Sequence, residues 1–187
     1  MTESKGKTDS SPQNTLTIKL KDGEVKIELF HEDAPGHVKR IKELAKEGMY
    51  DGVAFHRVID GFMAQTGDVK FGNSKKYDEN RVGTGGSEKP DLKAEFNSRK
   101  HVRGTCSMAR SNSPDSANSQ FFICFESASF LDHEYTVWGQ VIEGMEYVAN
   151  IKRGAEGSGS VTDPDIMMKV SSPKPVKKRK ASKNKAK

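Results

Sequence analysis

The chain has 187 residues, of which 33% are hydrophobic and 30% charged, and its formal net charge is +5. This length fits one ordinary domain with tails, and the low hydrophobic share implies that part of the chain stays outside any core. The longest unbroken apolar run, at 121–125, is far shorter than the roughly 20 residues of a membrane-spanning helix, so no membrane partner is expected.

The charge is unevenly distributed along the chain. Residues 171–187 contain eight Lys or Arg and no acidic residue, residues 1–14 are balanced, and residues 15–170 contain 21 basic and 24 acidic residues. Both end segments are polar and lack apolar periodicity. We therefore predict a disordered segment at 1–14, a single folded domain at 15–170 and a disordered basic tail at 171–187.

The compartment is predicted from the chain start and the cysteines. The first 14 residues lack the apolar stretch of a secretory signal, and Cys106 and Cys124 are too few for a disulfide framework. We expect a cytoplasmic monomer with two free thiols in its core.

The folded part opens with a predicted β-hairpin. Apolar residues alternate with polar ones over 16–20 and again over 25–29, and Asp22-Gly23 between them is a strong turn signal. A helix is predicted next, because Pro35 suits its first position, apolar residues follow at helical spacing, and Gly48 can close it.

The rest of the pattern predicts the fold class. Short strand-like runs follow at 53–58, 62–66, 105–109, 120–125, 135–141 and 166–170, with a second helix over 145–151. Two helices among about eight short strands do not fit a repeated βαβ arrangement. We predict a mainly β fold, an eight-stranded antiparallel closed barrel capped by two α-helices. The poorly periodic stretch 69–118 is either a functional loop or disordered.

Most catalytic and metal-binding motifs are absent from the sequence. It has no G-x-S-x-G, H-E-x-x-H or C-x-x-C segment, and its five histidines lack the spacing of metal ligands. The G-T-G-G stretch at 83–86 lacks the ending of a phosphate-binding loop, so we interpret it as a structural turn. We expect neither a metal nor a cofactor.

Strand alternation indicates where a site could form. It predicts three pairs that share a strand face, namely Phe55 with Arg57, Met63 with Gln65, and Gln120 with Phe122. Together they would make an apolar pocket with a cationic rim. From spacing alone, however, an arginine on a strand is more often a surface ion-pair partner, and such aromatic residues are more often core. His56 is interpreted as structural.

Three segments together resemble a known family. F-H-R-V-I-D-G-F-M-A-Q at 55–65, S-M-A at 107–109 and S-Q-F-F-I at 119–123 resemble the signature of the cyclophilins, the peptidyl-prolyl cis-trans isomerases. Further segments at 84–86, 130–132 and 141–145 fall in the family's order. The resemblance spans 15–170 and implies an isomerase active in protein folding, on an eight-stranded antiparallel barrel with a helix at each end.

The resemblance also implies a set of site residues, with Arg57 as the catalytic residue. The substrate-binding residues would be Phe62, Met63, Phe122 and Leu131 around the proline ring, Gln65 and Gln120 as hydrogen-bonding side chains, and Ala109, Arg110, Phe130 and Tyr135 along the groove. The stretch 69–82 is longer than in compact members, so we expect the groove wall near 83–86 to differ.

Three of these positions resemble bacterial members more than the well-known eukaryotic ones. Phe130 stands where many members carry Trp, Tyr135 where many carry His, and Arg110 replaces an Asn. A phenylalanine ring has no N–H to donate, so the resemblance implies weak ciclosporin binding. Arg110 is either a solvated charge or a contact to the residues before proline.

The implied reaction needs no nucleophile, proton shuttle or cofactor. Rotation about a peptide bond loses amide resonance, a barrier of about 18–20 kcal/mol, and a catalyst needs only to bind the twisted form best. No covalent intermediate is expected, and the partners would be proline-containing peptides and unfolded or client proteins. The alternative is a non-catalytic proline-peptide-binding or chaperone module on the same fold, which could dispense with Arg57.

The basic tail at 171–187 leaves further alternatives open. It is either a solubilising extension or an arm for non-specific contact with polyanions, and the bacterial character of the body argues against a nuclear-localisation signal. The tail has no aromatic residue, so any nucleic-acid contact would be made to phosphates and would not be sequence-specific.

Overall fold

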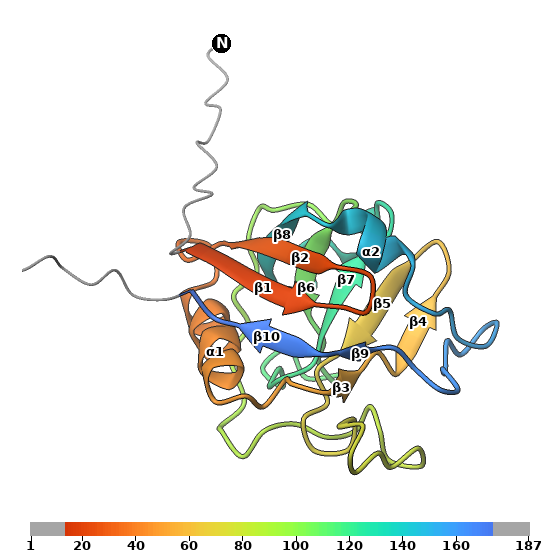
Figure 1. Cartoon of the computed structure of the whole chain (residues 1–187). Helices are drawn as coiled ribbons and strands as arrows, with labels where there is room; N and C mark the ends of the chain where they lie inside the picture. The colour runs from red at the N-terminus through yellow and green to blue at the C-terminus, as the bar shows by residue number, and fades with distance from the viewer. Residues whose placement is uncertain (1–13, 174–187) are drawn as a thin grey trace, which may run out of the picture.

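The structure is a computed structural model, and it describes residues 14–173 (Figure 1). The predictions made for 1–13 and for 174–187 lie outside the described residues. The main strands are β1 Thr15–Lys19, β2 Glu24–Leu29, β4 Arg57–Ile59, β5 Met63–Thr66, β6 Thr105–Met108, β7 Phe121–Cys124, β8 Val137–Glu143 and β10 Lys169–Ser171. They form one antiparallel sheet of eight strands in the order β10-β1-β2-β8-β6-β7-β5-β4, which confirms the predicted fold class.

The predicted opening hairpin and first helix are both present. β1 and β2 pair along their length, and the N–H of Leu20 donates to the carbonyl of Gly23 at 2.9 Å across the turn. Helix α1 spans Pro35–Lys46, with proline in its first turn. Gly48 beyond its end has a φ of 72°, a conformation that costs glycine little.

The second helix is shorter than predicted. Helix α2 spans only Met145–Ala149, although the apolar spacing continues to Ile151. The guanidinium of Arg153 donates to the carbonyls of Ala149 and Ile151, so a side chain satisfies groups that a further helical turn would have satisfied. Helices α1 and α2 lie at opposite ends of the sheet (Figure 1).

The barrel is not closed by a continuous ladder, so the prediction of a closed barrel overstates the closure. Strands β10 and β4 are the two ends of the sheet order and do not pair with each other. An isolated bridge joins Arg57 to Ser160, and a separate small sheet pairs β3 (Val53–Ala54) with β9 (Ile166–Met167). Ser160 is the last residue of the glycine-rich stretch 154–160, and glycines weaken a regular strand.

Phe55 lies in the main core, and the prediction that it shares a face with Arg57 is wrong. The predicted strand 53–58 is divided into β3 and β4, and residues 55–56 belong to neither. Strand alternation is lost at this break. Phe55 is therefore fully buried, whereas Arg57 is exposed.

The sheet separates two apolar clusters, and neighbouring residues of one strand contribute to different clusters. In β7, Phe121 and Ile123 belong to the main core, whereas Phe122 belongs to the second cluster, because successive side chains point to opposite faces. The buried members of the second cluster are Met63, Phe122, Cys124, Ala128 and Leu131. Alternation thus gives the sheet a second apolar face.

Within the described residues, 67–104 contain no helix or strand, so the long irregular stretch expected from the sequence is present.

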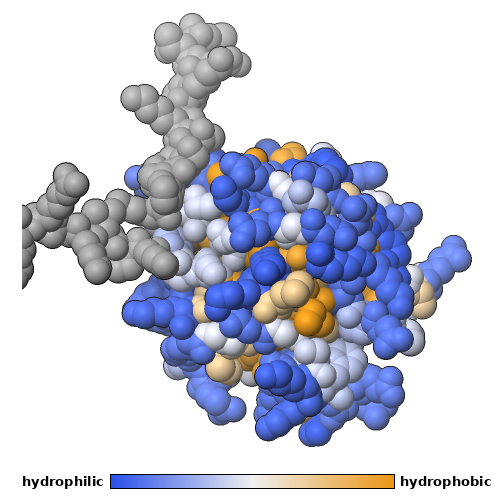
Figure 2. All heavy atoms as spheres, in the orientation of Figure 1, coloured by the Kyte–Doolittle hydropathy of each residue, from blue (hydrophilic) through white to orange (hydrophobic). Residues whose placement is uncertain are grey.

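The face that carries β1, β10 and α2 is mostly hydrophilic, with small hydrophobic spots between the charged side chains (Figure 2). No helix among residues 14–173 is long and apolar enough to cross a membrane.

Candidate active site

The second apolar cluster brings together the residues predicted to hold a proline ring. Met63 on β5, Phe122 on β7 and Leu131 on a short 3-10 turn, Ser129–Leu131, are buried, and Phe62 packs against them. Phe130 of the same turn is 71% exposed and lies against Phe62, with ring centroids 5.6 Å apart. The cluster therefore has a buried floor and an accessible aromatic rim.

Arg57 stands beside this cluster and heads a chain of polar side chains. Its Nη1 donates to Oε1 of Gln65 at 3.2 Å, and Nε2 of Gln65 donates to Oε1 of Gln120 at 3.1 Å. Nε2 of Gln120 in turn donates to the carbonyl of Gly85 at 2.8 Å. The chain orients all three side chains and connects the arginine to the glycine-rich stretch 83–86.

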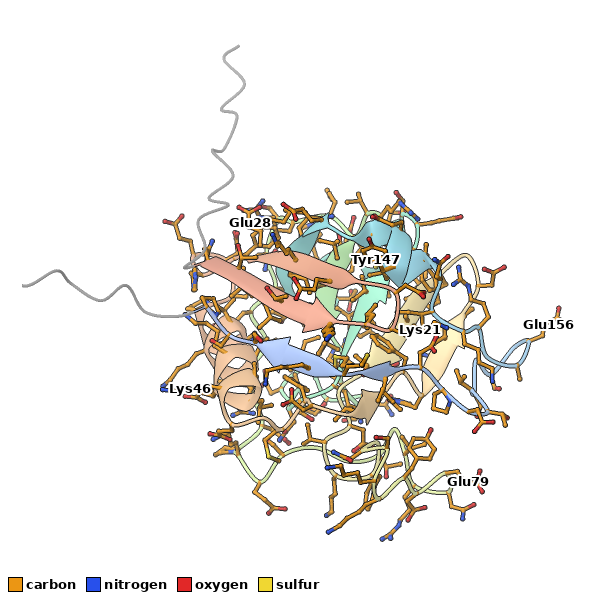
Figure 3. All side chains as sticks on the ribbon, in the orientation of Figure 1. Lys21, Glu28, Lys46, Glu79, Tyr147 and Glu156 are labelled. Carbon is orange, nitrogen blue, oxygen red and sulfur yellow. The ribbon has the colours of Figure 1, made fainter. Side chains whose placement is uncertain are left out.

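A cavity of about 680 Å³ continues the groove beyond the glutamines. Its lining includes both glutamines, residues 83–87, Ala109 and Arg110. Lys70 and Phe71 also line it, and both belong to the long stretch 69–82, called the insertion below. The insertion therefore forms part of the groove wall. Its charged end near Glu79 points away from the barrel (Figure 3).

Asp68 organises this wall, and the sequence analysis did not identify it. Its buried carboxylate accepts four backbone N–H groups, those of Lys70, Phe71, Gly83 and Gly85, at 3.1, 2.9, 2.8 and 3.0 Å. The two ends of the insertion are thus held by one side chain. An Asp followed by an irregular stretch is a turn signal, but nothing local predicts that it also reaches the far end of that stretch.

Arg110 and Tyr135 lie together at the other side of the groove. The guanidinium carbon of Arg110 is 4.6 Å from the centroid of the Tyr135 ring, and its Nη2 donates to the carbonyl of Glu134 at 2.8 Å. The ring of Tyr135 also meets Phe122 edge-on at 5.8 Å. Arg110 is therefore anchored on the groove and lines the cavity.

A buried polar network lies under the pocket floor and was also missed. Nδ1 of His101 is 2.9 Å from Oδ1 of Asp132, and its Nε2 is 2.9 Å from Oγ of Ser107. Burial lowers the pKa of His101, although the hydrogen bond to Asp132 acts to raise it. In the neutral form Nδ1–H donates to Asp132, so Nε2 and the carbonyl oxygen of Thr136, 3.1 Å from Oγ of Ser107, are both acceptors for the one hydroxyl hydrogen of Ser107.

This network resembles a catalytic triad only in its distances. Ser107 and His101 are 0% and 1% exposed, so no substrate carbonyl can reach the hydroxyl. Backbone and side-chain N–H groups of His101 lower the pKa of Asp132, which keeps its carboxylate ionised as an acceptor. The arrangement supports the floor of the pocket and offers no nucleophile.

The remaining candidate groups are buried. His56 is 6% exposed, and burial lowers its pKa. Cys106 and Cys124 are buried free thiols, and burial raises the pKa of Cys124 to about 12, so neither is a ready nucleophile. Among residues 14–173, no group of three or more His, Cys, Asp or Glu side chains is placed to hold a metal ion.

Comparison with known proteins gives consistent matches. The family model for cyclophilin-type peptidyl-prolyl cis-trans isomerases matches residues 15–172. A probable peptidyl-prolyl cis-trans isomerase of Brucella suis is 58% identical over 163 residues, which are 86% of this chain and 83% of that protein. Peptidyl-prolyl cis-trans isomerase B of Bacillus subtilis is 39% identical over 137 residues, 72% of this chain and 88% of its own.

Solved structures agree with the sequence matches. A cyclophilin-type isomerase of Cryptosporidium parvum, determined in the presence of the dipeptide Ala-Pro, has a TM-score of 0.72 and 27% identity, covering 86% of this chain and 99% of that one. A cyclophilin from Hirschia baltica has a TM-score of 0.71 and 27% identity, covering 86% of this chain and 74% of the other.

Proposed function

This chain belongs to the cyclophilin-type peptidyl-prolyl cis-trans isomerases, and we propose that Arg57 and the apolar cluster beside it perform the isomerisation. The register of three neighbouring strands supports the proposal, because Arg57 pairs with Gln65, which pairs with Phe122. Directly paired side chains share a face with Cβ atoms about 4.5–5.5 Å apart, which places Cβ of Arg57 about 10 Å from Cβ of Phe122 in the pocket floor.

The chemistry follows from what an X-Pro bond requires. Its two isomers differ by only about 0.5–1 kcal/mol, yet they exchange slowly because rotation breaks amide resonance. As the bond twists, the proline nitrogen becomes pyramidal and regains a lone pair. A guanidinium can donate a hydrogen bond to that lone pair and gains much less from the planar amide nitrogen, so it binds the twisted form preferentially.

Each part of the site then has a distinct role. The cluster of Met63, Phe122 and Leu131 would bury the proline ring while the preceding carbonyl swings around it. Gln65 and Ser158 use two of the five N–H donors of Arg57, so donors remain for the substrate. The groove at Ala109 and Arg110 would take the residues before proline, and the substrates would be proline-containing peptides and unfolded chains.

An exchange experiment tests the proposal. The rate of cis-trans exchange of a short Ala-Pro peptide is measured by NMR with the wild type, Arg57→Ala and the control Arg99→Ala, an arginine that stacks on Phe30 away from the groove. Loss of a preorganised donor typically lowers a rate about 10²- to 10³-fold. We expect that loss for Arg57→Ala only, with a much smaller change in peptide affinity.

The outcomes separate the proposal from the alternative. Wild-type exchange in a folded Arg57→Ala variant would remove the arginine from the mechanism. An equal loss of affinity and rate would make Arg57 an anchor for bound peptide. Binding by the wild type without any acceleration of exchange would favour a proline-peptide-binding module.

A further inference from the structure

The catalytic role proposed for Arg57 depends on its orientation, and that residue lies on β4, an end strand of the sheet. We propose that the glycine-rich loop 154–160 is a positioning element that holds Arg57 in its productive orientation. This inference rests on the proposed function of Arg57. It assigns the loop no contact with substrate.

The loop first fixes the backbone of β4. The N–H of Val58 donates to the carbonyl of Gly159 at 2.8 Å, and the carbonyl of Val58 accepts from the N–H of Gly154 at 2.8 Å. An isolated antiparallel bridge joins Arg57 to Ser160. The loop therefore covers the edge of β4 that β5 does not pair with, in place of a missing strand.

The loop also fixes the guanidinium directly. Nε of Arg57 donates to the carbonyl of Ser158 at 3.3 Å, while Nη1 donates to Gln65 at 3.2 Å. Two bonds to different atoms of a planar group restrict its rotation, whereas one bond alone would let the plane turn. The backbone carbonyl is thus the partner of the arginine on the side away from the glutamines.

Glycine at position 159 allows this close approach. Gly159 is buried with a φ of +74°, and a Cβ there would lie 2.6 Å from Cγ1 of Ile59 and 3.2 Å from Cγ of Arg57. The base of the loop is fixed to the same strand end, because Nε of Arg153 lies 3.0 Å from Oδ1 of Asp60.

The outer end of the loop differs from this inner end and provides a control. Gly157 has a φ of +86°, yet a Cβ there would meet nothing within 4 Å. The neighbouring Glu156 projects away from the barrel (Figure 3). Alanine at 157 and at 159 therefore imposes a similar backbone strain, and only the second alanine presses on the side chains of Ile59 and Arg57.

The test compares Gly159→Ala with Gly157→Ala for exchange of an Ala-Pro peptide, thermal unfolding and the NMR signal of the Arg57 side-chain Nε–H. Small displacements of a catalytic group can cost up to about 10²-fold in rate. We expect Gly159→Ala to lower kcat on the order of tenfold with little change in KM, and to shift the Nε–H signal. Gly157→Ala should retain the wild-type rate and signal.

A double variant shows whether the effect passes through Arg57. If it does, Gly159→Ala should cause no further loss of rate in an Arg57→Ala background. The proposal would be overturned if Gly159→Ala lowered the rate of the Arg57→Ala variant by the same factor as it lowers the wild-type rate. It would also be overturned if a folded Gly159→Ala variant were as active as Gly157→Ala. A wild-type rate for Arg57→Ala alone would instead refute the proposed function, and the Nε–H signal would still report on the positioning.

One measurement needs no variant and holds even where Gly159→Ala does not fold. The ¹⁵N order parameter of Arg57 Nε in the wild type should approach the rigid value of about 0.85. A value below about 0.6, typical of a mobile group, would overturn the proposed positioning.

Discussion

The imidazole ring of His101 lies nearly parallel to the phenyl ring of Phe122, with their centroids 6.1 Å apart and their planes at 17°. Phe122 forms the floor of the candidate pocket, so a polar side chain supports this floor from below. His101 is itself held at both ring nitrogens, by Asp132 and by Ser107. The orientation of the pocket floor therefore depends on a hydrogen-bonded network that a bound proline would not touch.

Replacing Asp132 should loosen the pocket floor. Asp132→Asn removes the charge that accepts both the backbone N–H and Nδ1–H of His101, and a hydrogen bond to a charged group contributes about 1.5–3 kcal/mol. We expect a loss of stability in that range together with a raised KM for an Ala-Pro peptide. Denaturant unfolding and peptide exchange measure the two effects.

The control for this change is Asp115→Asn. Asp115 also accepts a backbone N–H, that of Ala94, but it is exposed and, within residues 14–173, does not contact His101 or the second apolar cluster through any bond. The Asp115→Asn variant should therefore lose little stability and have the KM of the wild type. If Asp132→Asn behaves in the same way, His101 does not determine the orientation of Phe122.

Asp68 should be required for the groove wall. Asparagine offers one acceptor oxygen and one NH₂ group, so Asp68→Asn would turn a donor toward backbone N–H groups that the carboxylate now satisfies. We expect a loss of about 2–3 kcal/mol in unfolding free energy and faster amide exchange at Gly83 and Gly85. Asp78→Asn in the same insertion is the control, because Asp78 accepts the N–H groups of Asn80 and Arg81 only within its own turn. Unchanged exchange at both glycines would show that Asp68 does not hold the wall.

The sequence predicts the strands and the apolar floor well, because both depend on local alternation. Phe121 and Phe122 are adjacent, and their opposite faces follow directly from strand geometry. Phe55 was misplaced because the break between β3 and β4 depends on pairing with Met167 and Ile166, more than 100 positions away in the chain. No local pattern indicates that break.

The supporting residues of the site could not be predicted for a related reason. His101 and Asp132 are 31 positions apart, and Asp68 reaches Gly85 across 17, all in irregular segments without periodicity. The role of Arg57 was implied by family resemblance, since its spacing alone favoured a surface ion pair. Its contact with the carbonyl of Ser158 spans 101 positions and involves the backbone, which sequence patterns do not reveal.

An indole at position 130 should strengthen ciclosporin binding. Phe130 is 71% exposed beside Phe62, so a larger ring fits without entering the core and adds one N–H donor. Phe130→Trp should tighten binding by about 0.5–1.5 kcal/mol, with little effect on peptide turnover. Calorimetric titration measures the change, and Phe96→Trp, at another exposed phenylalanine, is the control. Equal affinities for Phe130→Trp and wild type would place this position outside the ligand contact.

The basic tail should affect polyanion binding and leave isomerisation unchanged. Truncation after Pro173 keeps Ser171, which pairs with Thr17, and removes all eight Lys and Arg of residues 171–187. If the full chain binds duplex DNA through these cations, the slope of log affinity against log salt should approach −0.9 per phosphate neutralised and flatten on truncation. Peptide exchange should be equal for both chains. A large loss of exchange would make the tail part of the active domain.

The buried histidines should make the protein less stable in mild acid. Burial lowers the pKa of His37, His56 and His101 from their ordinary value of 6.5, so the unfolded chain binds protons at a higher pH than the folded one. Stability rises with pH wherever the unfolded state holds more protons. The contribution of each histidine to the free energy of unfolding is therefore complete above pH 6.5. It falls as the pH drops below 6.5, by up to about 1.4 kcal/mol per pH unit.

His56 offers the simplest test, because the other two are paired with Glu95 and Asp132. The unfolding free energy of His56→Gln is measured by denaturant between pH 7 and pH 5. Its slope against pH should be smaller than that of the wild type, by an amount that corresponds to at most one proton taken up on unfolding. His133→Gln, which makes the same substitution at an exposed histidine, is the comparison variant. An unchanged slope in His56→Gln would mean that folding does not alter proton binding by His56. The acid sensitivity would then have to arise from His37 and His101, whose carboxylate partners oppose the effect of burial.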